Sequence, residues 1–338
     1  MFQALLEKLA RREDLSAAES AGAMAAIMEG TVSDAALAGF LTALAMKGEQ
    51  PAEIVGLART MRERAVQLSK AYPDVVDLCG TGGDRSGTFN VSSVASIVVA
   101  ACGVRVAKHG NRSVSSRCGS ADLFEALGVP AAATPELVER MLDEAGMAFL
   151  FAPVFHPSMR HAAAARRAIG LRTAFNLLGP LTNPVRPRWQ IVGVPRPELT
   201  EMIARALMLL GSERAWVVHG ADGLDEISTV GYTKVSECHQ GTVNTFYVHP
   251  ADYGLARATA DSIAGGDVAA NAAIARAVLG GSAGPARDIV LLNAGAALLV
   301  AGRAATVRDG IAMAGDALDS GRARAVLATM ADVAGTTA

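Results

Sequence analysis

Residues 75–101 read VVDLCGTGGDRSGTFNVSSVASIVVAA, and this stretch decides the fold class. It opens with a short apolar strand, Val75–Cys79, continues into a polar loop rich in glycine, and ends in a buried helix, Val91–Ala101. The alternation continues with a strand at 104–107, a helix at 121–127, and strands at 190–194 and 216–219, each followed by a loop and helical periodicity. Such alternation predicts a mostly parallel sheet covered by helices, which binds ligands beyond the carboxyl ends of its strands.

The first seventy residues follow a different pattern, that of four short helices. Apolar residues recur three and four positions apart, as over residues 37–44. Ser16 followed by Glu19 is the pattern of a capping box at a helix start. Small apolar helices with thin stripes often pack against another subunit, so this part is also a candidate dimer surface. The expected fold is therefore a small all-helical domain plus a larger α/β domain.

Composition limits the class of protein. The chain has 338 residues, a length typical of about two domains, and its formal charge of −2 argues against a dedicated nucleic-acid binder. Glycine, with 34 residues, is in excess of the usual value of about 7%. Four cysteines without a C-x-x-C pair indicate reduced thiols rather than disulfides or zinc. The N-terminus lacks the pattern of a signal peptide and no apolar run reaches about 18 residues, so we expect a cytoplasmic protein without a membrane span.

Two loops have the composition of phosphate-binding sites. In the first, Gly80–Ser93, glycines let successive backbone N–H groups face an anion at the start of a helix. It is neither a Walker A loop, since no Gly-Lys-Ser/Thr follows, nor a G-x-G-x-x-G fingerprint, since Arg85 occupies the last glycine position. The second, Lys108–Ser120, places three basic residues beside glycines and hydroxyls, which suits a second phosphate. The alternatives are an ordinary glycine-rich turn for the first loop and loop-bracing hydrogen bonds for His109 and Asn111.

Asp225 and Glu226 follow a predicted strand, and adjacent carboxylates supply the hard oxygen ligands that Mg²⁺ prefers. The alternative is a helix N-terminus that favours acidic residues through its dipole. Zinc is not expected at His156 and His161, because their spacing of five does not match a zincin helix. In the run Arg166–Pro184 an arginine facing a cleft would bind a carboxylate bidentately, although at least one of its arginines lies on a solvated helix face.

These motifs together resemble the anthranilate phosphoribosyltransferase family, of the nucleoside-phosphorylase-like phosphoribosyltransferase class, over nearly the whole chain. The resemblance rests on GTGGD (80–84), KHGNR (108–112), GSAD (119–122), HPxM (156–159), RTxFNxLGPLxNP (172–184) and DE (225–226). It implies transfer of the phosphoribosyl group of 5-phosphoribosyl 1-pyrophosphate (PRPP) to the amine of anthranilate, giving N-(5-phosphoribosyl)anthranilate and pyrophosphate in tryptophan biosynthesis. It also implies Mg²⁺ as cofactor and a homodimer. The implied domains are a helical one of 1–70 joined by about 164–186, and an α/β one of 73–163 and 187–338.

The resemblance also implies roles for single residues, according to their place in these motifs. Those implied to bind PRPP are Gly80, Gly83, Asp84, Thr88, Asn90, Val91, Ser92, Ser93, Lys108, His109, Gly110, Asn111, Arg112, Ser113, Val114, Ser115, Ser116 and Ser120. Those implied to meet anthranilate are Gly80, His109, Asn111, Arg166 and Gly179, and those implied to hold Mg²⁺ are Ser92, Asp225 and Glu226. The chain departs from the family pattern at Ser93, often threonine, at Cys118, and at Ser116-Arg117, but no implied ligand is lost.

The implied reaction needs no general base, because the anthranilate amine is neutral near pH 7 and attacks without prior deprotonation. An oxocarbenium-like sugar develops as the bond from ribose C1 breaks, and Lys108, Mg²⁺ and loop amides are expected to stabilise the leaving pyrophosphate. Two alternatives stay open: a pyrimidine-nucleoside phosphorylase and a non-enzymatic nucleic-acid-binding relative. The first would not need the intact Gly80–Asp84 loop, the Asp225-Glu226 pair or Arg166. The second would show a basic surface and eroded loops.

Overall fold

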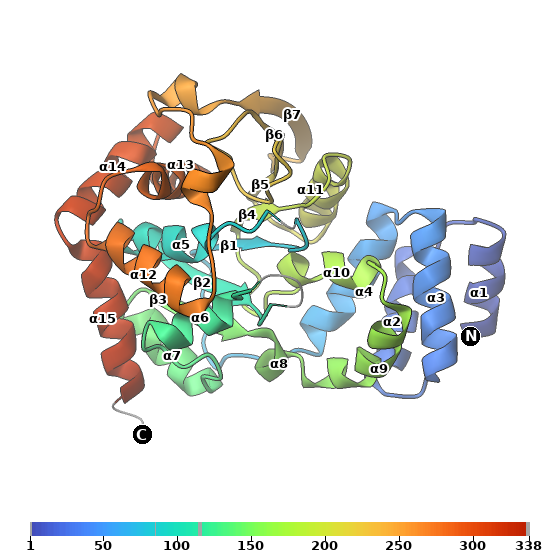
Figure 1. Cartoon of the computed structure of the whole chain (residues 1–338). Helices are drawn as coiled ribbons and strands as arrows, with labels where there is room; N and C mark the ends of the chain where they lie inside the picture. The colour runs from blue at the N-terminus through green and yellow to red at the C-terminus, as the bar shows by residue number, and fades with distance from the viewer. Residues whose placement is uncertain (1, 85, 114–116, 336–338) are drawn as a thin grey trace.

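The computed structural model describes residues 2–84, 86–113 and 117–335, and places a helical part beside a larger α/β part (Figure 1). The N-terminal helices are α1 (Phe2–Ala10), α2 (Ala17–Met28), α3 (Asp34–Lys47) and α4 (Pro51–Glu63). They confirm the four helices predicted for the first seventy residues. Ser16 and Glu19 form the predicted capping box, in which each side chain satisfies the other's free backbone N–H at the start of α2.

A seven-stranded sheet of order β3-β2-β1-β4-β5-β6-β7 forms the centre of the larger part. Its strands are β1 (Val75–Gly80), β2 (Arg105–Gly110), β3 (Met147–Phe151), β4 (Trp189–Gly193), β5 (Arg214–Gly220), β6 (Thr233–His239) and β7 (Thr242–Val248). The first five strands pair in parallel and the last two are antiparallel, which confirms the predicted fold class. The helical pattern predicted after residues 216–219 is wrong, because β5 is followed by the hairpin of β6 and β7.

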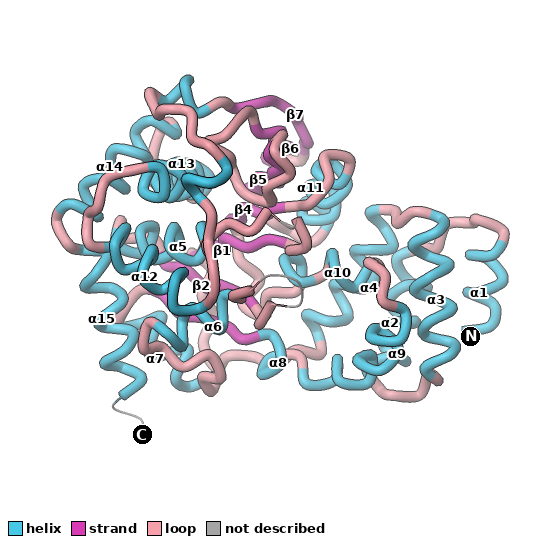
Figure 2. Tube along the Cα trace, in the orientation of Figure 1, coloured by secondary structure: helices cyan, strands magenta, loops and turns pink. Residues whose placement is uncertain are grey.

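Helices flank the sheet on both faces, as Figure 2 shows in cyan around the magenta strands. The α-helices after β1 are α5 (Val91–Ala101), α6 (Ser120–Ala126), α7 (Pro135–Glu144), α8 (Ala152–Phe155), α9 (Ala163–Ile169), α10 (Ala174–Leu177), α11 (Leu199–Leu209), α12 (Val268–Leu279), α13 (Pro285–Val300), α14 (Val307–Asp319) and α15 (Arg322–Gly335). Short 3₁₀ turns are η1 (Pro157–Ala162), η2 (Gly179–Leu181), η3 (Pro250–Tyr253) and η4 (Ala260–Ile263). No helix in the described ranges is long and apolar enough to cross a bilayer.

Two clusters of buried apolar side chains lie on opposite faces of the sheet. Because successive side chains of a strand point to opposite faces, Leu78 faces the cluster built with α5 and α13, whereas Cys79 faces the other. The second cluster joins α11 to helices α1–α4. Ala165 and Phe175 belong to it as well, so the segment that carries α9 and α10 packs with the N-terminal helices.

The order of the strands fixes where loops can meet. From β1 the chain proceeds to β2 and β3 on one side, and later to β4 and β5 on the other. A reversal of this kind opens a crevice at the carboxyl ends of the strands. The loops that follow β1, β2, β4 and β5 therefore converge on one edge of the sheet.

Candidate active site

The loop after β5 lies against the ends of β1 and β4, and two glycines make this approach possible. A Cβ at Gly80 would lie 2.5 Å from Asp225 Oδ2, and a Cβ at Gly193 would lie 1.5 Å from the Asp225 carbonyl oxygen. Asp225 Oδ2 also accepts a 3.1 Å hydrogen bond from the Gly82 amide. Residues 221–232 contain no helix, so the alternative that Asp225 and its neighbour begin a helix is wrong. Gly193, which the sequence analysis did not single out, is part of this arrangement.

Glu226 reaches the same place from the next position in the loop. Its Oε1 accepts a 3.0 Å hydrogen bond from the backbone N–H of Ser92, in the first turn of α5. Lys108, on β2, donates to the Leu78 carbonyl oxygen and, at 3.3 Å, to Ser92 Oγ. Lys108 is only 2% exposed, so its positive charge lies beneath the loops. The structure thus brings Ser92, Glu226 and Lys108 together.

Burial and mutual repulsion make these carboxyls weak acids. Burial raises the pKa of Asp225 well above its usual range, and the negative charges of Asp84 and Glu226 raise it further. Burial raises the pKa of Glu226 to about 7, although the Lys108 ammonium opposes the shift. A divalent cation would remove this repulsion, and carboxylate and hydroxyl oxygens suit Mg²⁺. In the described part of the chain no three His, Cys, Asp or Glu side chains form a metal cluster, so water or substrate oxygens would complete such a site.

The first predicted phosphate loop is held on both sides. Gly83 has a φ of +81°, and a Cβ there would lie 1.4 Å from Arg172 Nη1, so the arginine packs directly against the loop. Thr88 pairs with Ala264 in an isolated β-bridge that ties the loop to the segment before α12. The left-handed backbone angle favours glycine at position 83, and a Cβ there would force the Arg172 guanidinium to move.

The start of α5 is fixed by a chain of amide side chains. Asn90 donates a 3.1 Å hydrogen bond to the Cys118 carbonyl oxygen and accepts one of 3.0 Å from the Asn271 side chain. Val91 and Ser93 are buried, so they lie deeper than the other predicted residues of this turn, Asn90 and Ser92. Asn271, on α12, supports the loop from a position that no motif in the sequence marked.

The second predicted phosphate loop lies between β2 and α6. Arg112 forms ion pairs with Asp122 at 2.5 Å and Glu125 at 2.7 Å, so carboxylates neutralise its charge in this structure. Ser120 Oγ donates a 3.2 Å hydrogen bond to the Asn111 carbonyl oxygen, and a Cβ at Gly110 would lie 2.4 Å from Ser120 Oγ. Ser113 N lies where a Cβ at position 119 would clash, 2.3 Å away. Val114, Ser115 and Ser116 lie outside the described residues.

His109 connects this loop to the run 172–184. Its Nδ1 lies 3.0 Å from the Gly179 carbonyl oxygen. A carbonyl only accepts, so Nδ1 carries the proton and Nε2 presents a lone pair, which has no partner among the described residues. Burial lowers the pKa of His109 to about 3, so the ring is neutral near pH 7. The ring packs edge-on against His156, with 5.4 Å between centroids.

A fully buried pair, Asp77 and Asn183, anchors the same run to the sheet. Asn183 Nδ2 donates to Asp77 Oδ2 at 2.9 Å and to the Ala107 carbonyl oxygen at 2.8 Å. Asp77 Oδ1 accepts from the His109 backbone N–H at 3.2 Å. The sequence analysis missed this pair, although an aspartate inside the apolar run VVDLC was a signal for it.

Arg166 and Gly179 are both predicted to face anthranilate, and the structure gives them different neighbours. Gly179 contacts His109 through its carbonyl oxygen. Arg166 lies on α9, where its guanidinium carbon is 5.9 Å from the centre of the Phe175 ring. Within the described ranges the Arg166 guanidinium has no hydrogen bond or ion pair, so it is open to a carboxylate ligand.

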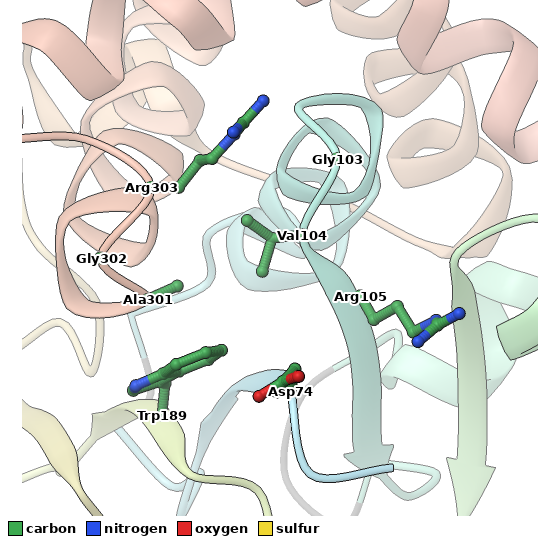
Figure 3. Close-up of a pocket in the computed structure, with 8 residues that line it drawn as sticks. All are labelled: Asp74, Gly103, Val104, Arg105, Trp189, Ala301, Gly302 and Arg303. Atoms are coloured by element: carbon green, nitrogen blue, oxygen red, sulfur yellow. The ribbon is translucent and has the colours of Figure 1, made fainter.

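A cavity of about 400 Å³ lies at the opposite edge of the sheet, where Asp74, Arg105 and Trp189 stand at the amino ends of β1, β2 and β4 (Figure 3). In Figure 3 the Arg105 and Arg303 side chains extend away from the Trp189 ring. None of the predicted site residues lines this cavity, so it is separate from the converging loops.

Comparison with known proteins gives a consistent result along the chain. Residues 72–324 match the glycosyl transferase family α/β domain, and residues 3–65 match the helical bundle domain of that family. The chain is similar to the anthranilate phosphoribosyltransferase of Moorella thermoacetica, with 55% identity over 98% of this chain and 97% of the relative. Among solved structures it is similar to the Thermus thermophilus enzyme of that name (44% identity, TM-score 0.93, 98% and 99% coverage). It is also similar to the Saccharomyces cerevisiae enzyme in complex with PRPP and Mg (28% identity, TM-score 0.90, 99% and 98% coverage).

Proposed function

This chain belongs to the anthranilate phosphoribosyltransferase family, and we propose that the loops after β1, β2 and β5 form its active site. It is a glycosyltransferase of tryptophan biosynthesis, and it moves the phosphoribosyl group of PRPP to the anthranilate amine, releasing pyrophosphate. The observation that carries the site is the carboxylate pair Asp225–Glu226, held by the amides of Gly82 and Ser92. Two half-buried, mutually repelling carboxyls suit a divalent cation, and the glycine-rich amides beside them suit phosphate oxygens.

PRPP is assigned to the two glycine-rich loops. The assigned residues are Gly80, Gly83, Asp84, Thr88, Asn90, Val91, Ser92, Ser93, Lys108–Ser116 and Ser120. Backbone N–H groups at the start of α5 and in the first loop suit an anion. Arg112 has to exchange its carboxylates for phosphate, and because exposed ion pairs contribute only about 0–1 kcal/mol, this exchange costs little.

Mg²⁺ is assigned to Ser92, Asp225 and Glu226, whose oxygens fit it. When bound, the ion supplies positive charge that offsets the charge of the pyrophosphate. The chain holds its part of the site in advance, since Gly80 and Gly193 leave room for Asp225. The Lys108 ammonium, fixed by the Leu78 carbonyl oxygen, adds a second positive charge near the leaving group.

Anthranilate is assigned to Gly80, His109, Asn111, Arg166 and Gly179. The unpaired Arg166 guanidinium suits the carboxylate of this acceptor. The amine is neutral and needs no general base, whereas the lone pair of His109 Nε2 suits an aromatic N–H and would orient it. Alignment of the amine with ribose C1 then supplies much of the rate.

The homodimer and the cytoplasmic location are also proposals. The dimer is implied by the family resemblance, and Met46, 74% exposed on α3, is the position chosen to probe it. The four cysteines are buried and free, which supports a reducing compartment. Sedimentation equilibrium of wild type and Met46→Lys tests the dimer. A wild-type monomer at micromolar concentration would contradict it.

The reaction is tested by mixing protein, Mg²⁺, PRPP and anthranilate and following anthranilate fluorescence. We expect fluorescence to fall only in the complete mixture, with each component omitted in turn as a control. Phosphorolysis of thymidine is measured in parallel, because a nucleoside phosphorylase would release thymine. Thymine release without fluorescence loss would overturn the proposed function.

A further inference from the structure

A second cavity, of about 270 Å³, lies where the helical part meets the amino ends of the central strands. Its lining residues are Arg59, Arg62, Glu63, Arg186, Leu209 and Leu210. The arginines come from the end of α4 and from the segment before β4, and the leucines from the end of α11. Because Arg186 and Leu210 precede β4 and β5, the cavity lies at the sheet edge opposite the proposed active site. The lining contains three arginines and one glutamate, so it carries an excess of two positive charges.

Arg62 is built into this cavity, since it is only 5% exposed. Its Nε donates a 2.6 Å hydrogen bond to the Leu181 carbonyl oxygen, and its Nη1 donates one of 3.2 Å to the Leu210 carbonyl oxygen. Nη2 is buried and has no acceptor among the described residues. Burial, together with the nearby charge of Arg186, lowers the pKa of Arg62 to about 10. A buried guanidinium with unused donors is costly unless an acceptor completes it.

The backbone conformation of Arg186 is an independent observation. Its φ of +52° lies in the left-handed region, which a residue other than glycine, asparagine or aspartate rarely adopts. Strained backbone of this kind is often retained where a side chain has a ligand to meet. Neither Arg186 nor Arg59 has a hydrogen bond or ion pair from its side chain to any described residue, so both guanidinium groups are open to a ligand.

We propose that this cavity is a binding site for a phosphate group, separate from the active site. Guanidinium groups match the tetrahedral oxygens of phosphate with paired N–H donors. An anion there would give Nη2 of Arg62 an acceptor and offset the excess charge of the three arginines. The cavity is larger than a bare phosphate, so it also accommodates diphosphate or a small phosphate ester.

The test uses the full-length protein and titrates inorganic phosphate by calorimetry, at constant ionic strength and without Mg²⁺. Arg186→Gly removes one cation while suiting the left-handed backbone, and Arg59→Gln removes another from an exposed position. Arg62 is left unchanged, because it holds two carbonyl oxygens. Arg324→Gln, an exposed arginine on α15, is the matched control for charge. Titrations with diphosphate and ribose 5-phosphate identify the preferred form of phosphate.

We expect one class of phosphate site to weaken at least tenfold in Arg186→Gly and Arg59→Gln and to stay unchanged in Arg324→Gln. Phosphate bound in the proposed active site remains in all variants and serves as an internal reference. Crystals soaked in arsenate should show the anion between Arg62 and Arg186. Superimposable titrations of wild type and Arg186→Gly, or arsenate found only at the loops after β1 and β2, would overturn the proposal.

Discussion

At the scale of single residues, the proposed metal site depends on two positions that have no side chain. A Cβ at Gly193 would lie 1.5 Å from the Asp225 carbonyl oxygen, so Gly193→Ala must move the loop after β5. We expect a loss of about 1–3 kcal/mol in unfolding free energy and at least a tenfold loss in Mg²⁺-dependent kcat/KM. Urea unfolding and steady-state kinetics measure both. Gly231→Ala, a position with open space around it, is the control and should leave both unchanged.

His156 gives a prediction for pH. Burial lowers its pKa to about 4 from an ordinary value of about 6.5, while Nε2 lies 3.0 Å from the Thr182 carbonyl oxygen. The pKa of His156 is lower in the folded than in the unfolded protein, so the neutral ring contributes to the unfolding free energy. This contribution is fully present above pH 6.5 and is lost as the pH falls towards 4. At about 1.4 kcal/mol per unit, the group contributes about 3 kcal/mol to the change.

His156→Gln should therefore flatten the pH dependence, because glutamine can donate to Thr182 and does not titrate. Urea unfolding at pH 7.5, 6, 5 and 4 measures the free energy of both proteins. Comparison at each pH cancels titrating groups that do not contact His156, such as Asp225 and Glu226, whereas His109, whose ring packs against His156, titrates together with it. Parallel curves for the two proteins would show that His156 is not buried as a neutral ring.

Arg166 is expected to bind the carboxylate of the acceptor. Arg166→Ala should raise the KM for anthranilate at least tenfold while the KM for PRPP changes little, because the lost contact concerns only one substrate. Arg167→Ala, on the same helix, is the matched control. Equal KM values for anthranilate in wild type and Arg166→Ala would remove Arg166 from the site.

At the scale of elements, the sequence predicted those helices and strands that have a clear local pattern of apolar residues. Helices α1–α5 and strands β1 and β5 follow from apolar periodicity and caps. The hairpin of β6 and β7 was missed, although Gln240 and Gly241 both have positive φ, the signature of a two-residue turn between strands. β3 was missed because a five-residue apolar run fits a buried helix as well as a strand.

The loop between β5 and β6 carries the carboxylate pair and gives an element-scale prediction. Asp225→Asn with Glu226→Gln removes two half-buried carboxyls whose pKa values are raised, so their ionisation destabilises the metal-free protein increasingly as the pH rises from about 4 through about 7. At pH 8 without Mg²⁺ the double variant should unfold at a higher temperature than wild type, with the difference vanishing only below about pH 4, the ordinary pKa of such carboxyls in the unfolded chain. Its Mg²⁺-dependent turnover should be lost.

Calorimetry with and without Mg²⁺ checks this prediction. Wild type should gain thermal stability from the ion at pH 8, and the double variant should not. Asp222→Asn, in the same loop but exposed, is the control. A double variant that still gains stability from Mg²⁺ would place the metal elsewhere.

At the scale of the whole molecule, the separation in sequence between contacting residues determines which parts of the site could be predicted. The glycine-rich loops were predictable, because each lies within one strand–loop–helix unit. The contact of Gly193 with Asp225, and of Asn271 with Asn90, joins segments far apart in the chain, and no local pattern encodes such contacts. We propose that residues 164–186 belong with the N-terminal helices, because Ala165 and Phe175 pack in the same cluster of apolar side chains as those helices.

The pair Asp77–Asn183 ties that segment to the sheet and gives a prediction about the molecule as a whole. Both side chains are fully buried, and Asn183 Nδ2 supplies hydrogen bonds to Asp77 and to the Ala107 carbonyl oxygen. Asn183→Ala removes a strong donor from each of two buried acceptors and leaves Asp77 Oδ2 only the Cys79 thiol at 3.4 Å, which should cost about 1–3 kcal/mol. The run that carries Gly179 would also lose its anchor beside His109.

We therefore expect Asn183→Ala to lower the unfolding free energy and to raise the KM for anthranilate more than the KM for PRPP. A purely structural role would lower stability and leave the ratio of the two KM values unchanged, so the ratio is the decisive measurement. Asn244→Ala, exposed on β7, is the matched control. A cycle with Asp77→Asn should show a coupling above about 0.5 kcal/mol, because the two side chains share one hydrogen bond. Additive effects would mean that Asp77 and Asn183 act independently.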